Sequence, residues 1–342
     1  MEDFKNNISM VTVVMAVYNS SGTLARAIES VINQSYNDWL MICVDDGSTD
    51  NSLEILNNYA QNDKRITVLS QKNGGPAAAR ATAYQIVQTP YVTFLDSDDL
   101  YSPDFLSSMM DCANRTDADT IIPNVLCEHP DGSFMNWNIA YGISEGTETT
   151  GEECFGKTFI QPTIHGINMW KTDLIKRFAL NKNATYNNMN ADEYIQRLLL
   201  LNSSKVAFSG GTYYYKCNMQ SITKGFTIRQ LGYLETCLKF IDLIEEYHLT
   251  EPVSSIIKEY YFRHIIHLQI RLYKDGNTLS KKDYETMRST IKEAYFQAMI
   301  YKDDFHFNEK KYPLLYKAIS TSGYLLFCLT CYLFAKYKKC NG

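Results

Sequence analysis

Three aspartates within four residues, in the stretch Asp96-Ser97-Asp98-Asp99, are the side chains of this 342-residue chain best suited to chemistry. They follow Tyr91–Leu95, a short run rich in β-branched and aromatic residues that predicts a buried strand. In an open α/β sheet, ligands bind beyond the carboxyl ends of the strands, so acids at this point face a crevice. Carboxylate oxygens suit Mg²⁺ or Mn²⁺ carrying a phosphate-bearing substrate. The stretch therefore predicts a metal site at a strand end.

The D-x-D spacing alone is weak evidence, because a chain with this much aspartate contains it about once by accident. A second copy, Asp117-Ala118-Asp119, lies in polar sequence with no strand before it. Position separates the two copies, and only the first follows a strand.

Two further strands are predicted to end in polar residues. Met10–Val17 is an apolar run that stops at Tyr18-Asn19-Ser20, and Trp39–Val44 stops at Asp45-Asp46-Gly47. No G-x-G-x-x-G follows the first strand, which argues against a dinucleotide-binding enzyme. A second set of acids is therefore expected at the same edge of the sheet.

A glycine-containing loop follows the next strand, Ile66–Leu69. Gly74-Gly75-Pro76 precedes an alanine-rich helix from Ala77 to about Val87. Pro76 at the helix start and the two glycines before it predict a tight loop whose backbone N–H groups point into the crevice. Arg80 lies on the first turn of that helix, where it is either a surface arginine or part of the site.

Strand and helix patterns alternate four times in about 110 residues, which predicts an α/β fold with a doubly wound, mainly parallel sheet. Ile121–Val125 extends the sheet, whereas Glu128–Gly156 is polar and predicts a hairpin or loop excursion. Later strands are expected at Gly166–Trp170, Val206–Phe208 and Thr212–Lys216, the last two forming one strand or two. Beyond Gln230 the apolar spacing is helical.

Composition limits the partners and the compartment. The formal net charge of −5 gives no support to nucleic-acid binding, which usually leaves a basic footprint. The polar start, Met1–Asn7, has no apolar signal core, and the nine cysteines are scattered rather than arranged as a disulfide framework. We expect a cytoplasmic protein.

The tail, residues 312–339, contains the apolar run Tyr324–Ala335 followed by Lys336, Lys338 and Lys339. The run is too short to span a bilayer. Aromatic edges and a basic end fit a helix lying at the inner face of the cell membrane, but also a helix packed in the protein. The helical extension could equally serve a homodimer, so these interpretations stay open.

Taken together, these motifs resemble the inverting glycosyltransferases of family 2, which have the GT-A fold. The resemblance runs from about Val11 to Phe226 and implies a catalytic domain over residues 1–228, with a nucleotide-sugar half (about 8–125) and an acceptor half (about 126–228). Residues 229–342 would form a helical C-terminal extension. The motifs that carry the resemblance are Val17-Tyr18-Asn19, Val44–Asp50, Asn73–Arg80, Leu95–Asp99, Ala191–Tyr194 and Tyr213–Thr223.

The resemblance also implies roles for individual residues. Tyr18 and Asp45 would contact the nucleotide base, and Asp98 would coordinate Mn²⁺ or Mg²⁺. Asp192 stands where the family keeps its catalytic base, although the neighbouring Glu193 is a second candidate and both acids could simply cap a helix. The implied nucleotide-sugar-binding residues are Val17, Tyr18, Asn19, Asp45, Asp46, Asn73, Gly75, Arg80, Asp96 and Ser97.

The implied reaction is a single displacement with inversion. A divalent ion would neutralise the diphosphate leaving group, and a carboxylate would remove the proton of the acceptor hydroxyl. The donor would be UDP-hexose or UDP-N-acetylhexosamine, and the acceptor a growing polysaccharide or a lipid-linked oligosaccharide. One alternative, a nucleotidyltransferase, would need a glycine-rich phosphate loop with a basic residue after the first strand, which the sequence lacks. The other is a catalytically silent sugar-binding or scaffold subunit of a polysaccharide assembly complex, which the intact acids disfavour.

Overall fold

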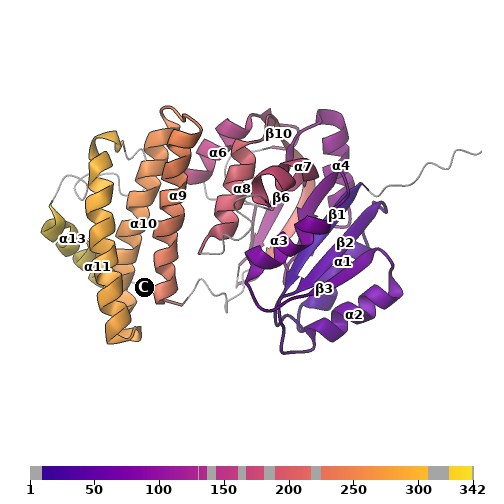
Figure 1. The fold of residues 1–342 in the computed structure, drawn as a ribbon, viewed down its shortest axis with the longest axis horizontal. Helices are drawn as coiled ribbons and strands as arrows, with labels where there is room; N and C mark the ends of the chain where they lie inside the picture. Colours follow the sequence, from indigo (N-terminus) through magenta and orange to yellow (C-terminus); the bar gives the residue numbers. More distant parts are fainter. Residues whose placement is uncertain are drawn as a thin grey trace, which may run out of the picture. The chain divides into compact units, whose positions relative to one another are not determined.

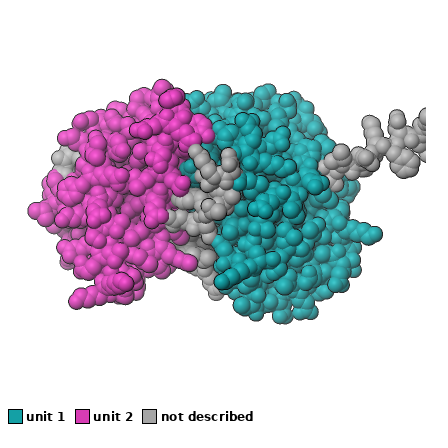
Figure 2. Space-filling view, viewed as in Figure 1, with its two compact units in different colours: residues 1–187, 191–218 teal, residues 188–190, 219–342 magenta. Residues whose placement is uncertain are grey.

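The computed structural model of the chain describes residues 10–129, 131–136, 144–160, 167–180, 189–216, 225–306 and 323–340. The chain forms two compact units, coloured separately in Figure 2. Unit 1 comprises residues 1–187 and 191–218, and unit 2 comprises residues 188–190 and 219–342. The functional boundary that the sequence places at residue 228 stays a prediction.

Unit 1 is built on one mixed sheet (Figure 1). Its described strands are β1 (Val11–Val17), β2 (Trp39–Asp45), β3 (Ile66–Ser70), β4 (Tyr91–Phe94), β5 (Leu100–Tyr101), β6 (Thr120–Glu128), β7 (Phe134–Asn136), β8 (Glu148–Thr149), β9 (Met169–Lys171) and β10 (Val206–Lys216). The strand order is β3-β2-β1-β4-β9-β6-β10-β5, with β7 paired to β6 and β8 to β10.

The first four strands of this order are parallel, as predicted. Val17 is in register with Asp45, and Asp45 with Ser70, so β1, β2 and β3 end at one edge of the sheet. Helix α1 (Leu24–Ile32) buries residues at helical spacing, and α3 (Pro76–Ile86) packs on β1 and β2. Helix α2 (Ser52–Asn62) packs mainly on β3.

The second half of the sheet is mixed, where the sequence predicted a mainly parallel arrangement. β9 runs antiparallel to both β4 and β6, whereas β10 runs parallel to β6. β10 is one strand with a register shift between Phe208 and Thr212, which accounts for its appearance in the sequence as two short runs. Helix α4 (Phe105–Thr116) packs on β10 and β6.

The segment Glu128–Gly156, predicted as a hairpin or loop excursion, is partly a helix. The hairpin is confirmed, since β7 pairs antiparallel with β6. However, α6 (Gly151–Ile160) is helical and packs on α8 (Ala191–Leu201), burying Cys154, Phe155 and Phe159. This tertiary contact outweighs the polar, glycine-containing sequence. The aromatic residues Trp137 and Tyr141 lie outside the described residues.

Between β9 and α8 the described chain forms a short helix, α7 (Thr172–Leu174), and a π-helical turn, η1 (Ile175–Ala179). The turn packs against α3 and α8. It therefore connects the helix that carries Arg80 with the helix that carries Asp192 inside unit 1.

Unit 2 is helical throughout its described residues. Its main helices are α9 (Gly232–Glu246), α10 (Val253–Asp275), α11 (Lys281–Ala298) and α13 (Tyr324–Cys340), with short turns η2 (Ile228–Leu231), η3 (Gly276–Thr278) and η4 (Met299–Asp304). α10 packs against α9, α11 and α13 and buries Tyr261, Phe262 and Ile265 in their common core. Within the described ranges, no helix has both the length and the apolar composition needed to cross a membrane.

Candidate functional site

The loops that follow β1, β2 and β4 are hydrogen-bonded to one another. Asn19, in the left-handed region with φ of 48°, accepts the Thr49 N–H through Oδ1 at 2.7 Å, and its own N–H donates to Ser48 Oγ at 3.0 Å. Ser20 and Ser97 join the loops after β1 and β4 through their hydroxyls at 2.8 Å. Several residues predicted to bind a nucleotide-sugar therefore share one sheet edge.

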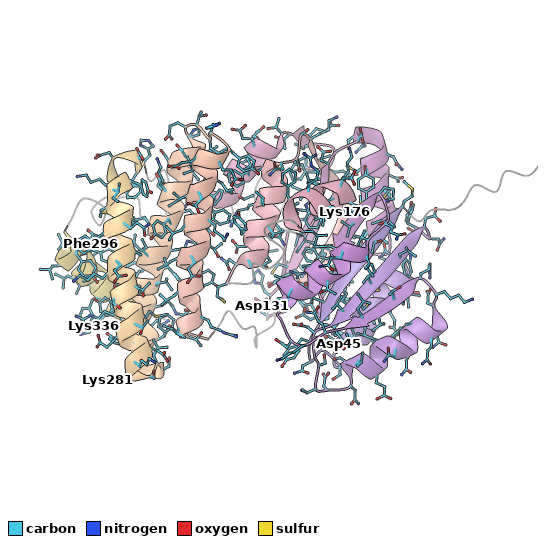
Figure 3. The ribbon with its side chains drawn as sticks, viewed as in Figure 1. Asp45, Asp131, Lys176, Lys281, Phe296 and Lys336 are labelled. Carbon is cyan, nitrogen blue, oxygen red and sulfur yellow. The ribbon has the colours of Figure 1, made fainter. Side chains whose placement is uncertain are left out.

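Tyr18 and Asp45, both at this edge of the sheet, differ in exposure. The Tyr18 side chain is 49% exposed, so its ring is available for contact with a ligand. Asp45 is buried and accepts hydrogen bonds from the Ser48 N–H and from Ser70 Oγ, both at 3.3 Å. Figure 3 shows Asp45 at the end of the strands from which these loops start. Contact of either residue with a nucleotide base stays a prediction.

Asp46 has a structural role that the sequence did not indicate, which is to hold the loop at Gly74 and Gly75. Its buried carboxylate accepts the Gly74 N–H at 2.8 Å, the Gly75 N–H at 2.7 Å and the Gln71 side-chain amide at 2.8 Å. The prediction that these two backbone N–H groups point into the crevice is therefore wrong, because Asp46 binds both. The loop is further fixed by Gly47, where an added Cβ would lie 3.0 Å from Asn73 N.

We expect Asp46→Ala to lower the free energy of unfolding by about 3 kcal/mol or more, because it leaves three partly buried donors without their charged acceptor. Urea denaturation of the full chain measures this effect. Asp131→Ala is the control, since Asp131 is exposed and such substitutions change stability by about 0.5 kcal/mol or less. Equal stability of the two variants would contradict the assigned task.

Arg80 links the strand-end acids to α8. Its guanidinium donates to Asp96 Oδ1 at 2.6 Å, its side chain is 11% exposed, and it lies over the Phe94 ring at 4.3 Å. Asp192 also interacts electrostatically with Arg80. Arg80 is therefore not a surface arginine, and its contact with a nucleotide-sugar stays a prediction. Carboxylates from the loop after β4 and from α8 thus converge on one cation.

A small cavity of about 40 Å³ lies at this point of convergence. Arg80, Asp192 and Gln196 are among its polar lining residues, and Phe94 and Trp170 are among its apolar walls. Asp192 lines this cavity, and its side chain is exposed to solvent. Desolvation by the surrounding protein raises the pKa of the Asp192 carboxyl, Arg80 opposes the rise, and Glu193 adds to it.

Glu193 has a different environment from its neighbour. Its carboxylate accepts a hydrogen bond from Arg197 Nη1 at 2.6 Å, one helical turn further on. Arg197 is buried and donates in turn to Thr158 Oγ1 of α6 at 2.9 Å. Glu193 is therefore part of an ion pair within α8 whose arginine is hydrogen-bonded to α6, whereas Asp192 lines the cavity.

The three acids predicted to face the crevice differ in their exposure to solvent. Asp96 and Asp98 are partly exposed, but Asp99 is 1% exposed. Burial raises the pKa of Asp99 to about 8, the charge on Asp96 adds to the rise, and hydrogen bonds from the Lys216 N–H and Tyr213 Oη oppose it. The expectation that Asp99 faces the crevice is wrong, because β10 supplies its hydrogen-bond donors.

Asp96 and Asp98 give the strand end two carboxylates for a divalent cation. In the part of the chain that the structure describes, no three acidic, histidine or cysteine side chains gather into a complete metal-binding group. Mg²⁺ is commonly held by one or two carboxylates together with substrate phosphates. Asp96 and Asp98 therefore fit a divalent cation that is held by protein carboxylates and substrate phosphates together. Metal binding by Asp98 stays a prediction.

Comparison with known proteins identifies the family. The sequence model of glycosyl transferase family 2 matches residues 12–182. An uncharacterized glycosyltransferase of Haemophilus influenzae is 43% identical over 105 residues, which are 30% of this chain and 42% of that protein. Glycosyltransferase GlyG of Streptococcus pneumoniae is 28% identical over 231 residues, covering 63% of this chain and 73% of the relative. The chain thus spans less than half of the Haemophilus protein.

Among solved structures, S. aureus TarS 1–349 in complex with UDP-GlcNAc superimposes with a TM-score of 0.70 at 15% identity, covering 97% of this chain and 92% of TarS 1–349. The fold is the GT-A fold with a helical C-terminal region, and the protein is a glycosyltransferase. The chain belongs to glycosyltransferase family 2.

Proposed function

We propose that this glycosyltransferase transfers a sugar from a UDP-sugar, a UDP-hexose or UDP-N-acetylhexosamine, to an acceptor hydroxyl with inversion. The observation that carries the proposal is the convergence of Asp96 and Asp192 on Arg80 beside one cavity. This convergence brings Asp96, at the strand end predicted to bind the donor, and Asp192 of α8 to the same arginine within unit 1. The similarity in fold to TarS, which binds UDP-GlcNAc, supports a UDP-linked donor.

The proposal gives each side chain a role that the family resemblance implies and with which its surroundings agree. Tyr18 and Asp45 bind the base, and Arg80 orients Asp96 toward the sugar. Asp98 with Asp96 holds Mn²⁺ or Mg²⁺, which when bound neutralises charge on the diphosphate leaving group. Asp192 accepts the proton of the acceptor hydroxyl, and its raised pKa makes it a better base than an ordinary aspartate.

Calorimetric titration of the full chain with UDP-, GDP- and dTDP-sugars, with and without Mn²⁺, tests the proposal. Mn²⁺-dependent binding of the UDP class, together with UDP release in the presence of an acceptor glycan, is the expected result. Absent binding across the panel would favour the silent-subunit alternative. Release of pyrophosphate from a nucleoside triphosphate and a sugar 1-phosphate would instead favour a nucleotidyltransferase.

We further propose that α13 lies on the inner face of the cell membrane, where the acceptor is a growing polysaccharide or a lipid-linked oligosaccharide. One side of α13 buries Phe327, Cys331 and Ala335 in the core of unit 2. Another side exposes leucines that include Leu325 at 85% and Leu333 at 57%. Surfaces of exposed leucines flanked by aromatic rings are typical of interfacial helices.

The positive charge of α13 supports a lipid surface as the partner of its exposed leucines. The sequence Tyr324–Cys340 contains lysines and no acidic residue, while the whole chain carries a net charge of −5. Lys336 is exposed on α13 and, like the exposed Phe296 of α11, lies on the side of unit 2 where α13 lies (Figure 3). Basic residues next to exposed apolar ones favour anionic lipid.

We expect the full chain to co-sediment with phosphatidylglycerol vesicles, and the variant with Leu325, Leu329 and Leu333 changed to glutamine to bind at least about tenfold more weakly, because apolar burial contributes to interfacial binding. Ile86→Gln, which removes an exposed apolar side chain of unit 1, is the matched control. Unchanged sedimentation of the triple variant would contradict membrane contact. Loss of a concentration-dependent dimer in the same variant would assign the surface to a second copy.

A further inference from the structure

The hydroxyl of Tyr213 bridges the two ends of the acidic turn after β4. It accepts the Asp96 backbone N–H at 3.2 Å and donates to Asp99 Oδ2 at 2.7 Å. Tyr213 belongs to β10 and is fully buried, so a distant strand makes both contacts. The Tyr213 hydroxyl has one proton, which it donates in the hydrogen bond to Asp99. The lone pairs of the same hydroxyl oxygen remain to accept the Asp96 N–H.

The turn itself is closed at both ends. The Asp99 N–H donates to the Asp96 carbonyl at 3.1 Å, and Asp99 Oδ1 accepts the Lys216 N–H at 2.7 Å. Both backbone polar groups of Asp96 are therefore bonded, one to Tyr213 and the other to Asp99. Asp98 lies inside this closed turn, so the direction of its side chain depends on the bonds at either end.

The strand pairing next to the turn makes these bonds rigid. β5 pairs antiparallel with β10, with Tyr101 opposite Tyr213. The Tyr101 ring stacks on Phe105 at 3.8 Å between centroids, and its hydroxyl donates to the Phe94 carbonyl at 2.9 Å. All four aromatic side chains are at most 4% exposed. The Asp99–Tyr213 pair thus sits in close-packed surroundings that tolerate little displacement.

We propose that Asp99 and Tyr213 are positioning residues that hold the acidic turn so that Asp98 meets a divalent cation and the diphosphate of the donor. The inference rests on the proposed function and deepens it, since neither residue is among those predicted to touch the donor. Both act through Asp98, the acid that the closed turn carries. A bonded turn presents its carboxylates without first losing conformational freedom, which is the general advantage of preorganised sites.

The test is Mn²⁺-dependent UDP binding by the full chain, measured by calorimetry for the wild type, Tyr213→Phe and Asp99→Asn. Tyr213→Phe removes one oxygen and keeps the ring, and we expect it to weaken Mn²⁺-dependent UDP binding about tenfold or more, because it removes the hydroxyl that bonds both the Asp96 N–H and the Asp99 carboxyl. Raising Mn²⁺ should restore part of the affinity. Tyr214→Phe, the next residue of the same strand, is the matched control and should bind like the wild type.

A double-mutant cycle separates positioning from a general loss of stability. In an Asp98→Ala background, Tyr213→Phe should add no further loss of UDP affinity, because the residue through which it acts is gone. Equal Mn²⁺ dependence in wild type and Tyr213→Phe, with only the melting temperature lowered, would overturn the inference and leave a purely structural role. Failure of the wild type to bind UDP with any divalent ion would overturn the proposed function first, a result that the variants do not influence.

Discussion

Asp192→Asn should reduce the rate of sugar transfer by about 10²- to 10⁴-fold, the range over which a general base contributes, while UDP-sugar affinity stays within about twofold of the wild type. Asparagine keeps the size of the side chain at the cavity but does not accept the acceptor proton. The measurement is kcat for transfer to an acceptor glycan, with donor affinity determined separately by calorimetry.

The pH profile gives this prediction a second readout. The carboxyl must be ionised to act as a base, so kcat/KM falls as the pH drops through its pKa. Because burial raises that pKa above the ordinary aspartate value, the fall begins at a higher pH than for an exposed aspartate. The Asn variant should lose this acidic limb.

Glu193→Gln is the matched control on the same helix turn. Glu193 is bonded to Arg197, so its loss should lower stability, through the buried guanidinium left without its partner, and leave the rate within about threefold of the wild type. A large loss of rate in Glu193→Gln with a small one in Asp192→Asn would reverse the assignment of the base.

Strand ends were predictable because local chemistry marks them. Apolar, β-branched runs stop where carboxylates begin, and the structure ends β2 at Asp45 and β4 at Phe94, close to the predicted positions. The parallel pairing of β1 to β4 followed from the alternation of strands and helices, although their order in the sheet did not. The direction of β9 did not follow, because pairing with β4 and β6 depends on contacts that span much of unit 1.

The direction in which each acid points was not predictable, because partners distant in the sequence decide it. Asp99 turns inward to meet Tyr213, which is 114 residues further on, while Asp98 in the same motif remains partly exposed. Asp46 likewise turns to the loop at Gly75, 29 residues away. Adjacent aspartates of one motif thus have opposite environments.

The choice between Asp192 and Glu193, by contrast, had a signal within the sequence. Arg197 lies four residues after Glu193, the spacing at which charged side chains meet on a helix. Asp192 has Gln196 at the same spacing, a residue that does not neutralise it and that also lines the cavity. Helical charge pairing therefore favours Asp192 as the free acid of the two, before any tertiary contact is known.

Asp98→Ala should abolish the Mn²⁺-dependent part of UDP affinity and reduce kcat/KM by about a hundredfold or more, because the charge on the leaving diphosphate would lose the cation that offsets it. Alanine removes a partly exposed carboxylate from a closed turn, so we expect the fold to be kept. Calorimetry with UDP, with and without Mn²⁺, measures the Mn²⁺-dependent part of the UDP affinity. The melting temperature of the variant verifies that it is folded.

Asp117→Ala is the control for this prediction, since Asp117 belongs to the second D-x-D copy. Its side chain is 89% exposed and forms an ion pair with Lys171 at 2.8 Å, at the end of α4 and away from the loops after β1, β2 and β4. Loss of Mn²⁺-dependent binding in Asp98→Ala alone would show that a strand end, and not the D-x-D spacing, makes the donor site. Equal losses in both variants would contradict the argument from position.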